Sequence, residues 1–278
     1  MTKIIADTTC SLPQDLLRAR GIPFVPQIVI FGEQAYHDNG ELDTAAFLQK
    51  LRAATVLPKT AAPEPHQYFP YFAEAEKSGE TLIVVAPSAK VSGTVRSAEI
   101  ARQDYPKADV RIVDTQTIAC NLGTLVLIAN DLAQQGKTPE EIIATLNGYI
   151  PRGRLYFVLD TLEYLKRGGR IGGAKALLGE LLQVKPILQI REGQVQPFDQ
   201  ERTKKRAVAR LVETVSEQVK ASPNPHLCVL HVDAADEAEA LRTELAARTG
   251  ITDIPIYLLP PAIVVHAGPK ALGAGFFA

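Results

Sequence analysis

Between Thr81 and Asp114 the sequence reads TLIVVAPSAKVSGTVRSAEIARQDYPKADVRIVD. The run Thr81–Ala86 is apolar and β-branched over a length typical of a buried strand, so we predict a strand there. We predict a helix over Gly93–Asp104 and a second strand over Val110–Val113. A strand, a helix and a strand in succession indicate a parallel or mixed sheet covered by helices. In such sheets ligands usually lie at the carboxyl ends of the strands.

The same alternation continues on both sides of this segment. Toward the N-terminus we predict strand Lys3–Ala6, helix Pro13–Arg20, strand Phe24–Phe31, helix Thr44–Ala54, a proline-rich link Pro58–Pro65 and helix His66–Ser78. Toward the C-terminus we predict helix Asn121–Gln135, strand Leu155–Leu159, a hairpin over Ile187–Phe198, helix Lys204–Lys220, strand Leu227–Val232, helix Asp236–Thr249 and strands Ile256–Leu259 and Ile263–Val265. We therefore expect an α/β protein with two α/β domains, an N-terminal one over residues 1–149 with a parallel or mixed sheet and a C-terminal one over residues 150–278. A ligand site is expected in the cleft between them.

Composition excludes several classes of protein. The chain has 278 residues, of which 46% are apolar and 22% charged, and its formal net charge is −1. A general nucleic-acid binder needs a basic surplus, which this chain lacks. No window approaches the ~20 apolar residues of a membrane span, and Met1–Ala6 is too short for the core of a signal peptide, so we expect a cytoplasmic protein. The cysteines are far apart in sequence and not in metal-binding spacing, which indicates reduced thiols.

Ser92-Gly93-Thr94 stands between the strand ending at Ala86 and the following helix. The N-terminus of a helix presents unpaired N–H groups and partial positive charge, which favour a carboxylate or a phosphate. Gly93 would let a ligand approach the backbone closely. The alternative is that Ser92 only caps its helix.

Two other segments offer donors for an anion. In Ile263-Val264-Val265-His266-Ala267-Gly268-Pro269 a β-branched run ends on a histidine, and we expect a strand that delivers the imidazole to the edge of a sheet. The segment Leu165–Gly172 reads LKRGGRIG and combines three cations with three glycines, but it lacks the spacing of a phosphate-binding loop. Together with Ser92, these segments predict an anion site without a nucleophile and its base. The alternative is a hydrogen-bonded structural histidine and a solvated glycine turn.

Asp7 and Asp114 both follow predicted strands. Paired carboxylates there could serve acid/base chemistry or magnesium, but we interpret both as structural, because strand-end aspartates commonly cap a helix or brace a loop. The histidines show no metal-binding spacing, so we expect no metal and no cofactor.

Short segments along nearly the whole chain resemble the DegV family of bacterial fatty-acid-binding proteins. They match in order, at Asp7-Thr8-Thr9, Pro26–Tyr36 with Asp38, Pro58-Lys59-Thr60, Ser88–Thr94 with Ser97-Ala98, Asp114-Thr115, Tyr164–Gly172, Lys185–Leu188, Glu201-Arg202 with Lys204-Lys205, and His266–Pro269 with Ala271–Gly273. Each match is short, but so many in the same order make coincidence very unlikely.

The resemblance implies a carrier and not an enzyme. It implies that one long-chain fatty acid is buried between two domains, with its carboxylate held by Thr60 and Ser92, close to Gly93 and His266. It also implies a partner, the kinase subunit of fatty acid kinase, which converts the carboxyl group to an acyl phosphate. Arg170, Arg202 and His266 are then expected in a polar network near the carboxyl group that faces the kinase.

The chain departs from the family pattern at four positions. Ala61 and Ala62 stand where the family often has polar residues, Ala89 replaces a frequent serine, and Lys270 replaces a frequent glycine. The carboxylate site is therefore leaner than usual, and Lys270 adds a positive charge close in sequence to His266. The alternative to a carrier is a hydrolase or phosphoryl-transfer enzyme that uses Ser92 and His266 with a strand-end aspartate.

Overall fold

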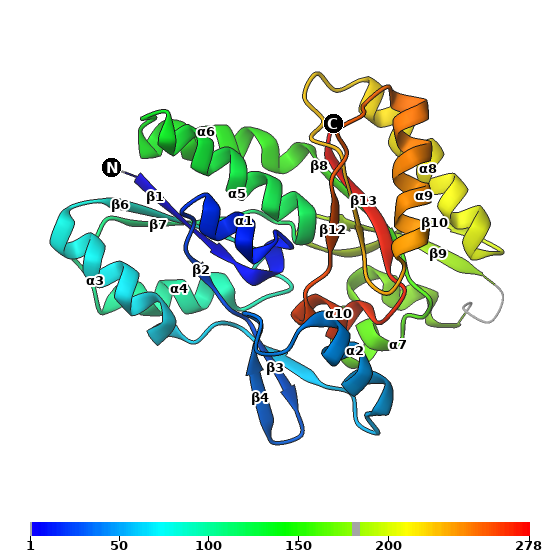
Figure 1. Ribbon diagram of the computed structural model, residues 1–278, viewed down its shortest axis with the longest axis horizontal. Coiled ribbons are helices and arrows are strands. Elements are labelled where there is room, and N and C mark those ends of the chain that lie inside the picture. The colour runs from blue at the N-terminus through cyan, green and yellow to red at the C-terminus, as the bar shows by residue number, and fades with distance from the viewer. Residues whose placement is uncertain (1, 180–183) are drawn as a thin grey trace.

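The computed structural model describes residues 2–179 and 184–278, and it contains three sheets (Figure 1). The first has four parallel strands in the spatial order β2 (Phe24–Val25), β1 (Thr2–Asp7), β6 (Thr81–Ala86) and β7 (Val110–Asp114). Its β6 and β7 are the two strands predicted from the quoted segment, with helix α4 (Thr94–Gln103) between them. The predicted α/β class is confirmed.

Alternate residues of the parallel strands face opposite layers of helices. Ile4 and Ile83 pack in one core with the helices α1 (Gln14–Ala19), α5 (Ala119–Gln134) and α6 (Pro139–Tyr149). Ile5 and Val84 pack in another core with α3 (Phe69–Ser78) and α4. Figure 1 shows α5 and α6 on one side of this sheet and α3 and α4 on the other. Both faces are covered, which explains why the strands read as continuous apolar runs.

The second sheet has six strands of mixed direction. Their spatial order is β10 (Gln194–Glu201), β9 (Lys185–Arg191), β8 (Gly153–Val158), β13 (Leu272–Phe277), β11 (Cys228–His231) and β12 (Ile256–Leu258). Helices α8 (Lys204–Lys220) and α9 (Ala235–Thr249) cover one face, where Tyr156, Val158 and Val229 are buried. The division into domains at residues 149 and 150 stays a prediction.

A small antiparallel sheet connects these parts, with strands β4 (Gln34–His37), β3 (Ile28–Phe31) and β5 (Lys59–Ala61). The short helices α2 (Thr44–Ala53), α7 (Glu163–Arg167) and α10 (Pro261–Ala267) lie near it (Figure 1). Four 3-10 helices complete the described elements: η1 (Thr8–Cys10), η2 (Pro65–Tyr68), η3 (Ile150–Arg152) and η4 (Gly172–Gly179).

The predicted strand Ile263–Val265 is wrong, because these residues lie within α10. Pro261 occupies the first turn of the helix, where its fixed φ and missing N–H suit a helix start. The buried carboxylate of Asp38 accepts a hydrogen bond of 3.1 Å from the N–H of Ala262, which satisfies one of the open donors of that turn. The β-branched residues are consequently the buried side of a helix, and His266 lies in its last turn.

Two other predictions fail for local reasons. The predicted strand Phe24–Phe31 is broken at Pro26, and its halves, β2 and β3, belong to different sheets. Strand β13 was not predicted, because its glycines hide the alternation of side chains. At Gly273 a Cβ would lie 2.5 Å from the carbonyl oxygen of Tyr156, so the close approach of β8 requires glycine there.

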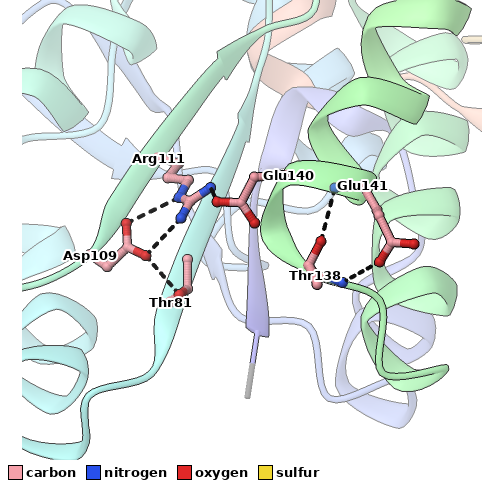
Figure 2. A network of polar contacts seen from close by, with 6 residues as sticks. All are labelled: Thr81, Asp109, Arg111, Thr138, Glu140 and Glu141. Atoms are coloured by element: carbon pink, nitrogen blue, oxygen red, sulfur yellow. Dashed lines mark hydrogen bonds and ion pairs between the residues drawn. The ribbon is translucent and has the colours of Figure 1, made fainter.

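Helix α6, also absent from the predictions, is fixed at its start by polar contacts (Figure 2). Thr138 and Glu141 form a reciprocal capping box. Arg111 of β7 contacts Asp109 at 3.1 Å and also pairs with Glu140 of the helix. The Arg111 guanidinium lowers the pKa of both carboxyl groups. This network ties α6 to the edge of the parallel sheet.

Candidate functional site

A cavity of about 110 Å³ lies between the parallel sheet, α10 and the face of the six-stranded sheet that α8 and α9 leave uncovered. Most of its wall is apolar, and the six-stranded sheet with its flanking residues supplies Leu155, Phe157, Leu159, Ile190, Val195 and Leu230. The polar side chains on the wall are those of Thr9, Gln27, Thr60, Ser92, Arg170 and His266.

The polar side chains come from loops and short elements that converge beside the parallel sheet. Thr9 follows β1, and Ser92 lies in the loop between β6 and α4. Thr60 belongs to β5, Arg170 follows α7, and His266 is on α10. The carboxyl ends of parallel strands are the usual place for ligands in α/β proteins.

The structure brings most of the predicted site residues together. Thr60, Ser92, Gly93, His266 and Arg170 all line this one cavity. Their predicted contacts with a carboxylate stay predictions.

Arg202 and Lys270 do not line the cavity. Arg202 is exposed between β10 and α8. Lys270 is also exposed, and its carbonyl accepts a hydrogen bond from Lys204. Of the other departures from the family pattern, Ala62 lines the cavity, and its Cβ would lie 3.2 Å from a Cβ added to Gly93. The two small residues thus leave room at this end of the cavity.

Thr60 and His266 form a hydrogen bond of 2.8 Å between Oγ1 and Nε2. Burial, with a smaller contribution from the Arg170 charge, lowers the pKa of His266 to about 4. The imidazole is therefore neutral at pH 7 and carries one N–H. If that N–H is on Nε2, it donates to Thr60 Oγ1, and the Thr60 hydroxyl proton is then free to donate to a carboxylate.

Gly168 makes room for the imidazole of His266. A Cβ at this position would collide with Nδ1 of His266, so only glycine allows the ring to lie where it does. Nδ1 is buried and has no hydrogen-bond partner among the described residues. Arg170 is held by the carbonyl oxygens of Val91, at 3.1 Å, and of Gly168, at 2.9 Å.

Ser92 belongs to a buried polar network. Gln27 Nε2 lies 3.2 Å from Ser92 Oγ, 2.8 Å from Thr94 Oγ1 and 2.6 Å from Asp7 Oδ2. Asp7 also accepts hydrogen bonds from the N–H and hydroxyl of Thr9. Burial raises the pKa of Asp7, and the donors around it oppose that shift. The network holds Ser92 and Thr9 at the cavity wall.

Gln27 and Thr9 were missed as site residues in the sequence. Gln27 was placed inside a predicted strand, although Pro26 before it marks a break where a polar side chain can turn inward. Thr9 was part of a matched segment but was given no role. In both cases the signal is a polar residue within two positions of a strand end.

The arrangement lacks the features of a hydrolase. Among the described residues Ser92 contacts Gln27 and Thr94, and no hydrogen bond joins it to a histidine. The N-cap position of α4 is Gly93, but Ser92 Oγ accepts a hydrogen bond of 3.3 Å from the N–H of Thr94, the first residue of the helix, so Ser92 also has a capping role. Asp7 caps η1, and Asp114 accepts from the N–H groups of Ala89 and Gln116, so both strand-end aspartates brace loops.

Within residues 2–179 and 184–278, no group of three or more histidine, cysteine, aspartate or glutamate residues could hold a metal ion. No helix in the same ranges is both long enough and apolar enough to cross a membrane.

Known proteins resemble the chain over its full length. A family model described as "Uncharacterised protein, DegV family" matches residues 1–278. A DegV domain-containing protein of Streptomyces coelicolor is 36% identical over 97% of this chain and 96% of its own. A relative of the same description from Clostridium perfringens is 34% identical over 99% of this chain and 98% of its own.

Solved structures agree with this result. A DegV family protein from Thermus thermophilus, described as fatty-acid binding, has a TM-score of 0.93 and 32% identity, and the match covers 100% of this chain and 99% of that one. DegV from Bacillus subtilis, described as a fatty acid binding protein, has a TM-score of 0.89 and 29% identity, with 100% and 99% covered.

Proposed function

The chain belongs to the DegV family, and on that premise we propose that it is a non-catalytic carrier that binds one long-chain fatty acid in the cavity. The observation that carries this proposal is the composition of the cavity wall, which is apolar except for six polar side chains. An amphiphile with one small polar head and a long tail fits such a wall. The two relatives described as fatty-acid binding share the fold over the whole chain.

The apolar wall would supply most of the affinity. Each buried methylene contributes about 0.8 kcal/mol, so a tail of about sixteen carbons gains on the order of 10 kcal/mol before losses in chain entropy. A carboxylate is costly to bury unless several donors satisfy it. Its main contribution would therefore be to orient the ligand.

The carboxylate would lie among Thr60, Ser92, Gly93 and His266. The hydroxyls of Thr60 and Ser92 each have a neighbouring group within hydrogen-bond distance that can support their oxygen, His266 for the first and Gln27 for the second. The Thr60 hydroxyl proton can then be donated to the ligand. The Ser92 proton points to Thr94 Oγ1, whose own proton goes to Asp7, so Ser92 has to turn its hydroxyl from Thr94 to the ligand. A neutral His266 fits this role, because it avoids placing another buried cation beside Arg170.

We further propose that the carrier presents the carboxyl group to a separate kinase subunit. One carboxylate oxygen would attack the γ-phosphorus of a nucleoside triphosphate held by the kinase. The new O–P bond forms as the bond to the bridging oxygen breaks, and the nucleoside diphosphate leaves with that electron pair. Arg170 would stabilise the negative charge during transfer, and the exposed Arg202 would contact the kinase.

The alternative is an enzyme that uses Ser92 and His266 for hydrolysis or phosphoryl transfer. It requires a base oriented toward the serine, and the hydrogen bonds of Ser92 and His266 lead to other residues. No observation of the described residues favours this alternative.

Mass spectrometry of the purified protein after denaturation tests the proposal. We expect about one long-chain fatty acid per chain, released without covalent attachment. A ligand-free protein that shows esterase turnover would overturn the carrier and favour the enzyme.

A further inference from the structure

A second hollow lies on the other side of the Thr60–His266 hydrogen bond. Thr60, Arg170 and His266 line both it and the cavity. The remaining wall of this outer hollow is formed by Val56, Leu57, Pro58, Lys59, Tyr164, Arg167, Gly168 and Val265. The Thr60–His266 pair thus stands between an apolar cavity and a second compartment.

The outer hollow is basic. Lys59, Arg167 and Arg170 line it, and no carboxylate is among the described residues on its wall. Lys59 is exposed and has no ion-pair partner among the residues that the structure describes. Arg167 pairs with Glu163 at 2.8 Å, but both side chains are more than half exposed, so that pair contributes little and can be exchanged.

Strand β5 and the residue that follows it divide the two compartments. Lys59 lines only the outer hollow, Ala62 lines only the cavity, and Thr60 lines both. A ligand head held at Thr60 therefore has the apolar wall on one side and three cations on the other. A carboxylate held at Thr60 does not need all three cations, because two hydroxyls and the imidazole already surround it.

We infer that the outer hollow is a binding site for a phosphoryl group joined to the ligand, namely the acyl phosphate that the proposed transfer would produce. The inference rests on the proposed function and assigns the product its own subsite. The tail stays in the cavity, the acyl carbon lies at the Thr60–His266 pair, and the phosphoryl oxygens contact Lys59, Arg167 and Arg170. Arginine suits these oxygens because its planar fork binds them through two hydrogen bonds.

Binding of two amphiphiles with equal tails tests this inference. After removal of copurified lipid, the affinities for palmitate and for hexadecyl phosphate are measured at pH 8, where an alkyl phosphate is largely dianionic. The variants are Lys59→Gln and Arg167→Gln, and the matched control is Lys166→Gln, an exposed neighbour outside both compartments. Each site variant should lose roughly tenfold affinity for hexadecyl phosphate and less than about twofold for palmitate. The control should match the wild type for both ligands.

The outcomes separate this inference from the proposed function. If palmitate binds normally and the two variants leave hexadecyl phosphate affinity unchanged, or if wild type does not bind hexadecyl phosphate, the subsite is overturned and the carrier stands. If neither amphiphile binds, the proposed function fails and the subsite fails with it. A competition experiment with inorganic phosphate extends the test. Inorganic phosphate should not compete with hexadecyl phosphate at equal concentration. Equal competition would mean a site for free phosphate and would overturn the link to the acyl chain.

Discussion

At the scale of single residues, the polar groups on the cavity wall are held in place by contacts with neighbouring residues. Ser92 is supported by Gln27 and Thr94, which in turn contact the buried Asp7. His266 has room for its ring because Gly168 carries no side chain. Such support fixes donors before a ligand arrives, so little ordering remains to oppose binding.

Replacing Ser92 and Thr60 by alanine should weaken the proposed carboxylate site. Removal of one donor to a buried charge costs about 1.5–3 kcal/mol. We expect Ser92→Ala to lower both the fatty acid content and the melting temperature, because a ligand bound only to the folded state stabilises it. Mass spectrometry and thermal unfolding of the same preparations measure both. Full occupancy in the double variant would show that the carboxylate lies elsewhere.

Replacing Arg170 by alanine should separate binding from transfer. The tail supplies most of the affinity and Ser92 and Thr60 remain, so the variant should still purify with fatty acid. Acyl phosphate formation by a cognate kinase subunit should fall at least tenfold. The pKa of His266 should rise, since the Arg170 charge helps to lower it, and NMR titration of the imidazole measures this. Equal losses of lipid and of phosphorylation would instead make Arg170 part of the carboxylate site.

At the scale of elements, the short helix α10 carries the imidazole and depends on a carboxylate from another sheet. Asp38 follows β4, is buried, and accepts from the first turn of α10. Burial raises the pKa of Asp38 to about 7, and the charge of Asp7 adds to that shift. The protonation of Asp38 is therefore linked to the stability of the fold around the first turn of α10.

The free energy of unfolding should record this linkage. Between about pH 4 and pH 7 the folded chain keeps a proton on Asp38 that the unfolded chain has lost, so the contribution of Asp38 falls as pH rises, by at most about 1.4 kcal/mol per unit. Above about pH 7 the contribution is constant. Asp38→Asn should remove this slope while its amide oxygen still accepts from Ala262. Asp7 and His266 also have pKa values that change on folding. The quantity to compare is therefore the difference between the free energies of unfolding of the wild type and Asp38→Asn, measured in urea from pH 5 to 8. A constant difference would contradict the assignment.

Local patterns determined which elements could be predicted. The strand, helix and strand of Thr81–Asp114 were predictable because each shows its own period over consecutive residues. Residues Ile263–Val265 were misread because β-branching is common both in strands and on the buried side of a short helix, and only Pro260-Pro261 gave the correct signal. Strand β13 was hidden by glycines whose reason lies in a neighbouring strand.

At the scale of the whole molecule, an anion site with Ser92, Arg170 and His266 was predictable from the residues, but Thr60 and the lipid were predictable only through the family resemblance. Thr60 and His266 are 206 positions apart in the sequence, and Gln27 and Ser92 are 65 apart. No spacing rule connects residues so distant. The apolar wall of the cavity has the same composition as a filled core, so its residues gave no separate signal.

The position of β13 has a consequence for the synthesis of the chain. It is the last described strand in sequence, yet it lies inside the six-stranded sheet, between β8 and β11 and antiparallel to both. While the ribosome is still making the preceding residues, β8 and β11 have no neighbour to join them, and each exposes an unpaired edge that invites aggregation. The part of the cavity wall that rests on β8 and β11 is therefore completed only after β13 has been made, although every lining residue precedes that strand.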